Sequence, residues 1–281
     1  MTNTDWPPPS QRLAIPPEPT EDVSPQLHRA LRGWLQQELV NVPPDTTVRP
    51  RTDYGFSVRQ IMLRLGTDIP PWGFPPETIL DAVHETLYQM QWVDPGPPVR
   101  GLELTLAAAN SIWRVATRPD GRRGLERCVD ETVTAAAREA VRTAPQRAAE
   151  HLRVAWNAAY GRNPDPDKAF NEAIRAVEEV ACPLVEQKKA NAGNATLGTV
   201  IGELGKNAPH KWELALPDLG GHPRDVGHVV GMMELLWHAQ VSRHGGAPKS
   251  RRQVEEEARS VVPLAAVLVH WLTTNVLRKK P

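Results

Sequence analysis

The uneven distribution of proline is the feature that most limits what this chain folds into. Of its 28 prolines, 17 lie in residues 1–100 and 11 in the remaining 181. Proline fixes φ and lacks an amide hydrogen, so it interrupts helix interiors and central strands. The first hundred residues are therefore predicted to form short helices and loops, and longer helices are expected after residue 100. The proline-dense stretch at 6–22 predicts an extended tail over 1–24 with polyproline II character.

The charge of the chain changes at the same place. Residues 1–99 carry 7 Lys and Arg against 12 Asp and Glu, and residues 100–281 carry 26 against 21. The zero net charge is thus the sum of an acidic part and a basic part. This neutrality excludes a uniformly basic nucleic-acid binder, but it allows one basic cleft in the second part.

Local signals predict short helices in the first part of the chain. A Ser-Pro pair at 24–25 is typical of a helix N-cap and first turn, and leucines at helical spacing follow it. A second helix is expected over 57–65 with Gly66 as its stop, and a third after the Pro-Pro pair at 75–76.

Longer helices are predicted in the alanine- and arginine-rich sequence that follows. The apolar spacing indicates helices over 102–115, 125–142 and 144–160, with a Pro-Asp-Gly turn at 119–121 and Gly161 as the last stop. Beyond the N-cap at 163–167, further helices are expected over 169–185, 196–204, 225–240 and 250–277. Only 212–216 fits a short strand. The predicted fold class is all-α, with a proline-punctuated helical domain over 25–145 and a helical bundle over 146–281.

Several classes of protein are excluded by missing motifs. The chain has no P-loop, no dinucleotide-binding glycine pattern, no HExxH and no GxSxG. Its two cysteines, Cys128 and Cys182, are too few for a disulfide framework or a four-cysteine zinc site, and they favour a reducing cytoplasm. The five histidines within 210–244 are not spaced as metal ligands, so we expect no metal and no cofactor. No signal peptide is visible, and the apolar run at 261–272 is shorter than the ~20 residues of a membrane span.

Two stretches carry a resemblance to a known family. Residues 151–185 contain Ala-Val-Glu at 176–178 and are followed by Thr-Leu-Gly at 196–198. Residues 234–246, with the sequence ELLWHAQVSRHGG, precede the predicted last helix. This order resembles the C-terminal domain of abortive-infection proteins, a branch of the HEPN (higher eukaryote and prokaryote nucleotide-binding) superfamily, over about residues 147–275.

The resemblance implies a ribonuclease. Many HEPN domains dimerise and cleave RNA without a metal, using an arginine and a histidine with four to six residues between them in the dimer cleft. Here His244 matches the histidine, and the arginine is represented by the adjacent Arg243 or replaced by His238. A histidine near neutral pKa can take the 2′-hydroxyl proton, and an arginine can hold the phosphate. Glu178, in Ala-Val-Glu, is expected to support the site.

The same resemblance implies partners. Lys249, Arg251 and Arg252 follow the His-Gly pair and are expected to grip the RNA backbone. A homodimer is expected, and so is regulation by an antitoxin or a phage-derived trigger acting through the N-terminal part.

Alternatives remain open from the residues themselves. Arg243, His244 and Gly245 also fit a helix end, where basic side chains and a glycine cap are common. Trp237 fits either a core position or a base-stacking position next to His238. The competing function is a catalytically inactive HEPN-like module that dimerises and binds a partner protein or a nucleotide. A DNA-binding role for the helix at 57–65 is disfavoured by the acidic charge of residues 1–99.

Overall fold

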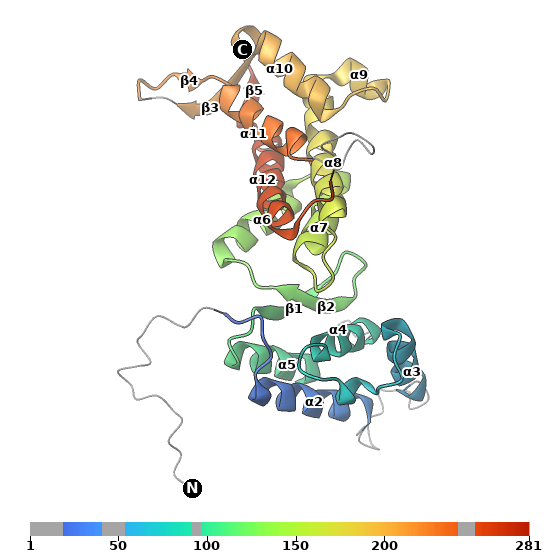
Figure 1. The fold of residues 1–281 in the computed structure, drawn as a ribbon. Helices are drawn as coiled ribbons and strands as arrows, with labels where there is room; N and C mark the ends of the chain where they lie inside the picture. The colour runs from blue at the N-terminus through green and yellow to red at the C-terminus, as the bar shows by residue number, and fades with distance from the viewer. Residues whose placement is uncertain (1–18, 41–53, 91–96, 218, 241–250, 281) are drawn as a thin grey trace, which may run out of the picture. The chain divides into compact units, whose positions relative to one another are not determined.

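The computed structural model describes residues 19–40, 54–90, 97–217, 219–240 and 251–280. Helices dominate these residues, as predicted, but two small antiparallel sheets are also present, so the fold is mainly helical rather than all-α (Figure 1). The chain divides into two compact units. The N-terminal unit runs to Thr117 and takes in Arg122–Cys128, and the C-terminal unit comprises Val129–Pro281 with the turn Arg118–Gly121.

The N-terminal unit packs short helices around a leucine-rich core. Ser24 caps α2 as predicted, since its Oγ accepts a hydrogen bond from the Leu27 amide at 3.2 Å. Gly66 follows α3 with φ +64°, the left-handed conformation that glycine adopts at a helix end. The helices of this unit are α2 (Pro25–Leu39), α3 (Tyr54–Leu65), the 3-10 turn η1 (Pro71–Gly73), α4 (Ile79–Gln89) and α5 (Pro97–Ala108).

A β-hairpin closes this unit where the sequence predicted helix. Strands β1 (Trp113–Thr117) and β2 (Arg123–Arg127) pair antiparallel, so the predicted helices over 102–115 and 125–142 are both wrong in part. Helix α5 stops early, and Asn110 then adopts φ 52°, which turns the chain out of the helix. The predicted Pro-Asp-Gly turn is confirmed and becomes the hairpin turn, with Gly121 at φ +79°.

Part of the predicted N-terminal tail is structured. Thr20 forms an isolated parallel bridge with Ser111, through hydrogen bonds to Asn110 and Ile112. The Glu21 carboxylate also pairs with Arg127 at 3.2 Å. Residues 1–18 of the predicted tail lie outside the described residues.

The C-terminal unit is built on long helices that pack side by side. Helices α7, α8 and α12 pack against one another, and α6 packs on α7 and α12 (Figure 1). Many of their buried residues are alanines, which let helix axes approach closely. The helices are α6 (Glu131–Thr143), α7 (Gln146–Tyr160), α8 (Pro166–Val185), α9 (Gln187–Asn191), α10 (Leu197–Lys211), α11 (Gly227–His238) and α12 (Glu255–Thr273).

A three-stranded sheet accompanies these helices. Its order is β4 (Pro223–Arg224), β3 (Trp212–Pro217), β5 (Leu277–Lys279). The strand predicted at 212–216 is confirmed, whereas the helix predicted over 250–277 ends earlier and is followed by β5. Helix α10 continues through Gly205, so the predicted stop there is wrong.

The boundary between the units differs from the predicted one. The compact units separate at Cys128 and Val129, so α6 belongs with the C-terminal unit rather than with a domain ending at residue 145. Among the described residues, no helix combines the length and apolar character needed to cross a membrane.

Candidate functional site

The segment 241–250 holds Arg243, His244 and Lys249, and these three predicted site residues lie outside the described residues. Its two ends are described. The preceding helix α11 ends at His238 with Ala239 as its C-cap, and the following helix α12 begins after the N-cap Val254. The contacts of these flanking residues are described below.

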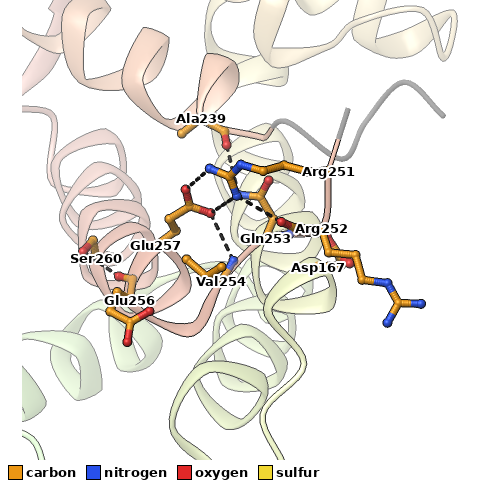
Figure 2. A network of polar contacts seen from close by, with 9 residues as sticks. All are labelled: Asp167, Ala239, Arg251, Arg252, Gln253, Val254, Glu256, Glu257 and Ser260. Atoms are coloured by element: carbon orange, nitrogen blue, oxygen red, sulfur yellow. Dashed lines mark hydrogen bonds and ion pairs between the residues drawn. The ribbon is translucent and has the colours of Figure 1, made fainter. Parts of the chain in front are cut away.

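Gln253 joins three helices at the returning end of the segment (Figure 2). It is buried, with 5% of its surface exposed. Its backbone amide donates to Asp167 Oδ1 of α8 at 3.2 Å, and its side-chain Nε2 donates to the Ala239 carbonyl at 3.0 Å. The same Nε2 also donates to Glu257 Oε2 of α12 at 3.3 Å. One side chain therefore ties the end of α11 to the start of α12, and its backbone ties both to α8.

Glu257 completes this junction. It is the third residue of α12, and its Oε2 accepts a hydrogen bond from the Val254 amide at 3.1 Å, which satisfies a free amide at the helix start. Arg251 forms a two-pronged ion pair with the same carboxylate, with Nη1 at 3.0 Å from Oε2. The bond to Arg251, aided by the Val254 amide, holds the pKa of Glu257 below its ordinary value, although desolvation opposes this.

The predicted RNA-binding residues at this end differ in their surroundings. Arg251 is occupied by Glu257, so its guanidinium already has an anionic partner. Arg252 is exposed, and Figure 2 shows its side chain pointing away from the junction. Both side chains are exposed, but of the two only Arg252 has no anionic partner among the described residues.

Gln240, the last described residue before residue 241, also binds α8. Its Nε2 donates to Asn171 Oδ1 at 2.5 Å. Asn171 lies one helical turn beyond Asp167, so Gln240 and Gln253 both bind the first turns of the same helix.

Glu178 caps the start of helix α10. Its Oε1 accepts a hydrogen bond from the Leu197 amide at 2.7 Å, at the first residue of α10. Thr196 and Thr199 exchange further hydrogen bonds at the same helix start. A carboxylate at a helix N-terminus satisfies a free amide and interacts favourably with the helix dipole. The Ala-Val-Glu stretch is therefore hydrogen-bonded directly to the Thr-Leu-Gly stretch.

Trp237 packs against this same helix start. A Cβ built on Gly198 would lie 2.9 Å from Trp237 Cζ2, a distance that real Cβ atoms do not reach, so glycine is needed for this close approach. Trp237 is therefore a packing residue between α11 and α10. The neighbouring His238 is exposed, and its imidazole makes no hydrogen bond to the described residues.

Sequence reasoning missed Gln253, Asp167 and Glu257. Glu257 carries a usable signal, because a glutamate three residues after a helix N-cap commonly bonds back to the cap amide. Gln253 and Asp167 are 86 residues apart in the chain, and neither stands in a local pattern.

The described residues offer no group of three or more His, Cys, Asp or Glu side chains placed to hold a metal ion. Comparisons with protein-family models, with curated proteins and with solved structures found no match to this chain. A functional interpretation therefore depends on the residues of this chain and their contacts.

Proposed function

We propose that the C-terminal unit cleaves RNA without a metal ion, as a HEPN-like ribonuclease, with Arg243 and His244 as its catalytic residues. One observation carries the proposal: Gln240 and Gln253, which flank residues 241–250 on either side, both bind α8, Gln240 at Asn171 and Gln253 at Asp167. Residues 241–252 contain four Lys or Arg, one His and no Asp or Glu. A basic sequence between two residues that bind the same helix suits the binding of a polyanion.

A second group of contacts supports the proposal. The stretches that carry the family resemblance are Ala-Val-Glu, Thr-Leu-Gly and the helix before the Arg-His-Gly. They contact one another through the Glu178 bond to Leu197 and the packing of Trp237 on Gly198. The three stretches that carry the resemblance therefore contact one another around the start of α10, which supports the proposal.

The proposed chemistry is an internal transesterification. His244 takes the proton of an RNA 2′-hydroxyl, the 2′-oxygen forms a bond to phosphorus, and the bond to the 5′-oxygen breaks. The 5′-oxygen leaves with a proton supplied by a protonated histidine, which gives a 2′,3′-cyclic phosphate and a 5′-hydroxyl. Arg243 stabilises the charge that develops on the phosphate. The second acid or base is His238 or His244 of a second protomer, since the proposal includes a homodimer.

The proposal has consequences for binding and regulation. Arg252 and Lys249 hold the RNA backbone, whereas Arg251 is paired with Glu257 at the start of α12. The N-terminal unit acts as the regulatory part, responding to an antitoxin or a phage-derived trigger. The substrate places this activity in the cytoplasm.

A second candidate is a catalytically inactive HEPN-like module that dimerises and binds a partner or a nucleotide. One observation favours it. Of the described residues expected to support catalysis, Glu178 serves as a helix cap and His238 makes no hydrogen bond to the described residues. These two residues therefore do not form a preassembled acid–base pair with each other.

The test uses the purified full-length protein with total RNA in EDTA. The wild type is compared with Arg243→Ala/His244→Ala, with His238→Ala, and with Arg138→Ala as a control on the exposed face of α6. We expect cleavage by the wild type and the control, and a loss of about 100-fold or more in the double variant. Equal, negligible cleavage by all proteins favours the inactive module, and loss in His238→Ala identifies that histidine as the second acid or base.

A further inference from the structure

Arg123, in the N-terminal unit, is a buried cation with no acidic partner among the described residues. Only 8% of its surface is exposed, although it is an arginine on a two-stranded hairpin. Its guanidinium Nη1 is fully buried and has no hydrogen-bond partner among the described residues. Other arginines of the same hairpin are matched by acids, since Arg114 pairs with Glu126 at 2.7 Å and Arg127 pairs with Glu21 at 3.2 Å.

More positive charge gathers beside the start of β2. Arg122 lies over the ring of Tyr88, 4.5 Å from its centroid, and its Nη1 donates to the Tyr88 carbonyl at 3.2 Å. Arg64 of α3 lies over the same ring at 4.6 Å and pairs with Glu85. The guanidinium groups of Arg122 and Arg64 therefore lie at the same aromatic ring of α4, and Arg123 is the next residue of the chain after Arg122.

Helix α4 is fixed along this part of the hairpin. The Leu125 amide, two residues after Arg123, donates to His84 Nδ1 at 3.0 Å. His84 and Tyr88 are one turn apart on α4, so this helix contacts Arg122, just before β2, and Leu125 within β2, on either side of Arg123. All of these residues belong to one compact unit. The position of Arg123 is therefore set by contacts on both sides of it.

A buried guanidinium without an anion is unfavourable, because the charge loses its hydration and its donors stay unused. Natural proteins keep such groups where a ligand supplies the missing partner, and arginine is suited to phosphate because its planar fork makes two parallel hydrogen bonds. We propose that Arg123, with Arg122 and Arg64, forms a binding site for the phosphate group of a small ligand. A doubly charged phosphate suits this region better than a carboxylate, because Arg122 directly precedes Arg123, Arg64 lies over the same Tyr88 ring as Arg122, and Glu85 is paired with Arg64.

The site is tested on the full-length protein by calorimetric titration and by thermal unfolding at constant ionic strength. The ligands are inorganic phosphate, adenosine monophosphate as a phosphate carried on a nucleoside, and acetate as a singly charged carboxylate. We expect phosphate or the nucleotide to bind and to raise the Tm, and acetate to have no effect. Tighter binding of the nucleotide identifies a nucleotide ligand, whereas equal binding identifies the phosphate group alone.

Arg123→Met and Arg127→Met form a matched pair, since both residues lie on β2 and Arg127 already has an acid partner. In Arg123→Met we expect Kd for phosphate to rise by about tenfold or more. The Tm without phosphate is expected to rise in the same variant, because an unpaired buried charge is replaced by an apolar chain of similar length. Arg127→Met is expected to bind phosphate as the wild type does.

Three results overturn the proposal. The first is that wild-type protein shows no phosphate binding, which needs no variant to interpret. The second is that wild type, Arg123→Met and Arg127→Met respond equally to phosphate, which indicates a general anion effect. The third comes from Arg123→Lys, which is also the variant to use if Arg123→Met does not fold. This substitution keeps the positive charge but removes the planar guanidinium that makes two parallel hydrogen bonds. Unchanged phosphate affinity in this variant contradicts a role for the guanidinium.

Discussion

Gln253 and Arg123 are buried to a similar degree, at 5% and 8% exposure, but their polar atoms meet different surroundings in the two units. In the C-terminal unit, the Gln253 side chain donates to the Ala239 carbonyl and to Glu257, and its amide donates to Asp167. In the N-terminal unit, Arg123 Nη1 meets no acceptor among the described residues. A satisfied buried group contributes to stability and fixes geometry, whereas an unsatisfied one costs free energy until a ligand binds.

The cores of the two units also differ in the size of their side chains. Alanines are frequent in the buried face of the C-terminal unit, and leucines dominate the N-terminal core. Small side chains bring long helices close together, so the polar groups at helix ends come within hydrogen-bonding distance of one another. Large side chains on short helices fill a core but leave the ends of elements farther apart. The contrast predicts that the C-terminal unit supplies rigid positioning and the N-terminal unit supplies ligand binding.

The largest expected effect is the loss of stability when a core residue of either unit is replaced by alanine. Phe170 of α8 and Leu31 of α2 are 1% and 0% exposed, each in its own core. Phe170→Ala is expected to destabilise the C-terminal unit by about 3–5 kcal/mol, and Leu31→Ala the N-terminal unit by about 2–5 kcal/mol. Scanning calorimetry is expected to show two transitions, with one moved by each variant. A single transition moved by both variants contradicts independent cores.

Removing the junction residue is the next largest effect. Gln253→Ala leaves the Ala239 carbonyl without its donor and is expected to cost about 1–3 kcal/mol in urea unfolding of the C-terminal unit. Gln240→Ala, at the other end of the segment, is the control. Its side-chain hydrogen bond to Asn171 is exposed to solvent, so we expect a loss under about 0.5 kcal/mol. Equal losses in the two variants mean that the junction has no special role.

The sequence predicted those helices whose ends carry strong local signals. Ser24 and Pro25 start α2, and Asp165 and Pro166 start α8, because each pair supplies a cap acceptor and a fixed first φ. The hairpin was missed because strands of five residues are too short to show alternation and the apolar spacing before Trp113 continues that of α5. The Pro-Asp-Gly turn between the strands was the signal that could have found it.

The site was less predictable than the fold. Glu178 and Arg251 were assigned to catalysis and RNA binding by their place in the sequence. The structure pairs them instead with the Leu197 amide and with the Glu257 carboxylate. A bond between residues 19 apart depends on how the helices pack, and residue type alone does not reveal it. The buried, unpartnered state of Arg123 is likewise a tertiary property, since nothing in its neighbours distinguishes it from the other arginines of the hairpin.

A smaller effect is expected at Glu178. Glu178→Ala removes the acceptor for the Leu197 amide and is expected to cost about 0.5–2 kcal/mol, as for loss of a helix cap. Glu178→Gln keeps an oxygen acceptor and is expected to retain most of this stability. RNA cleavage measured in both variants separates the roles. If Glu178→Gln keeps its stability but loses cleavage, the carboxylate has a catalytic role beyond capping.

The last prediction concerns the pH dependence of the stability of the C-terminal unit. Burial, aided by the charges of Glu178, Glu179 and Glu186, raises the pKa of the Cys182 thiol from 9.0 to about 11. Because the folded state keeps this proton when the unfolded state has lost it, the stabilisation is complete below pH 9 and is lost as the pH rises towards 11.

The comparison of wild type with Cys182→Ala isolates this contribution, because other groups titrate equally in both proteins. We expect the urea midpoint of the wild type to fall more steeply than that of Cys182→Ala over this pH range. Cys128→Ala is the control, since Cys128 is exposed and the rise in its pKa from burial is smaller. Parallel midpoints for wild type and Cys182→Ala would mean that the thiolate of Cys182 is tolerated in the folded state. The packing around Cys182 on α8 would then be looser than in the rest of the C-terminal core. That result would weaken the contrast between the cores of the two units.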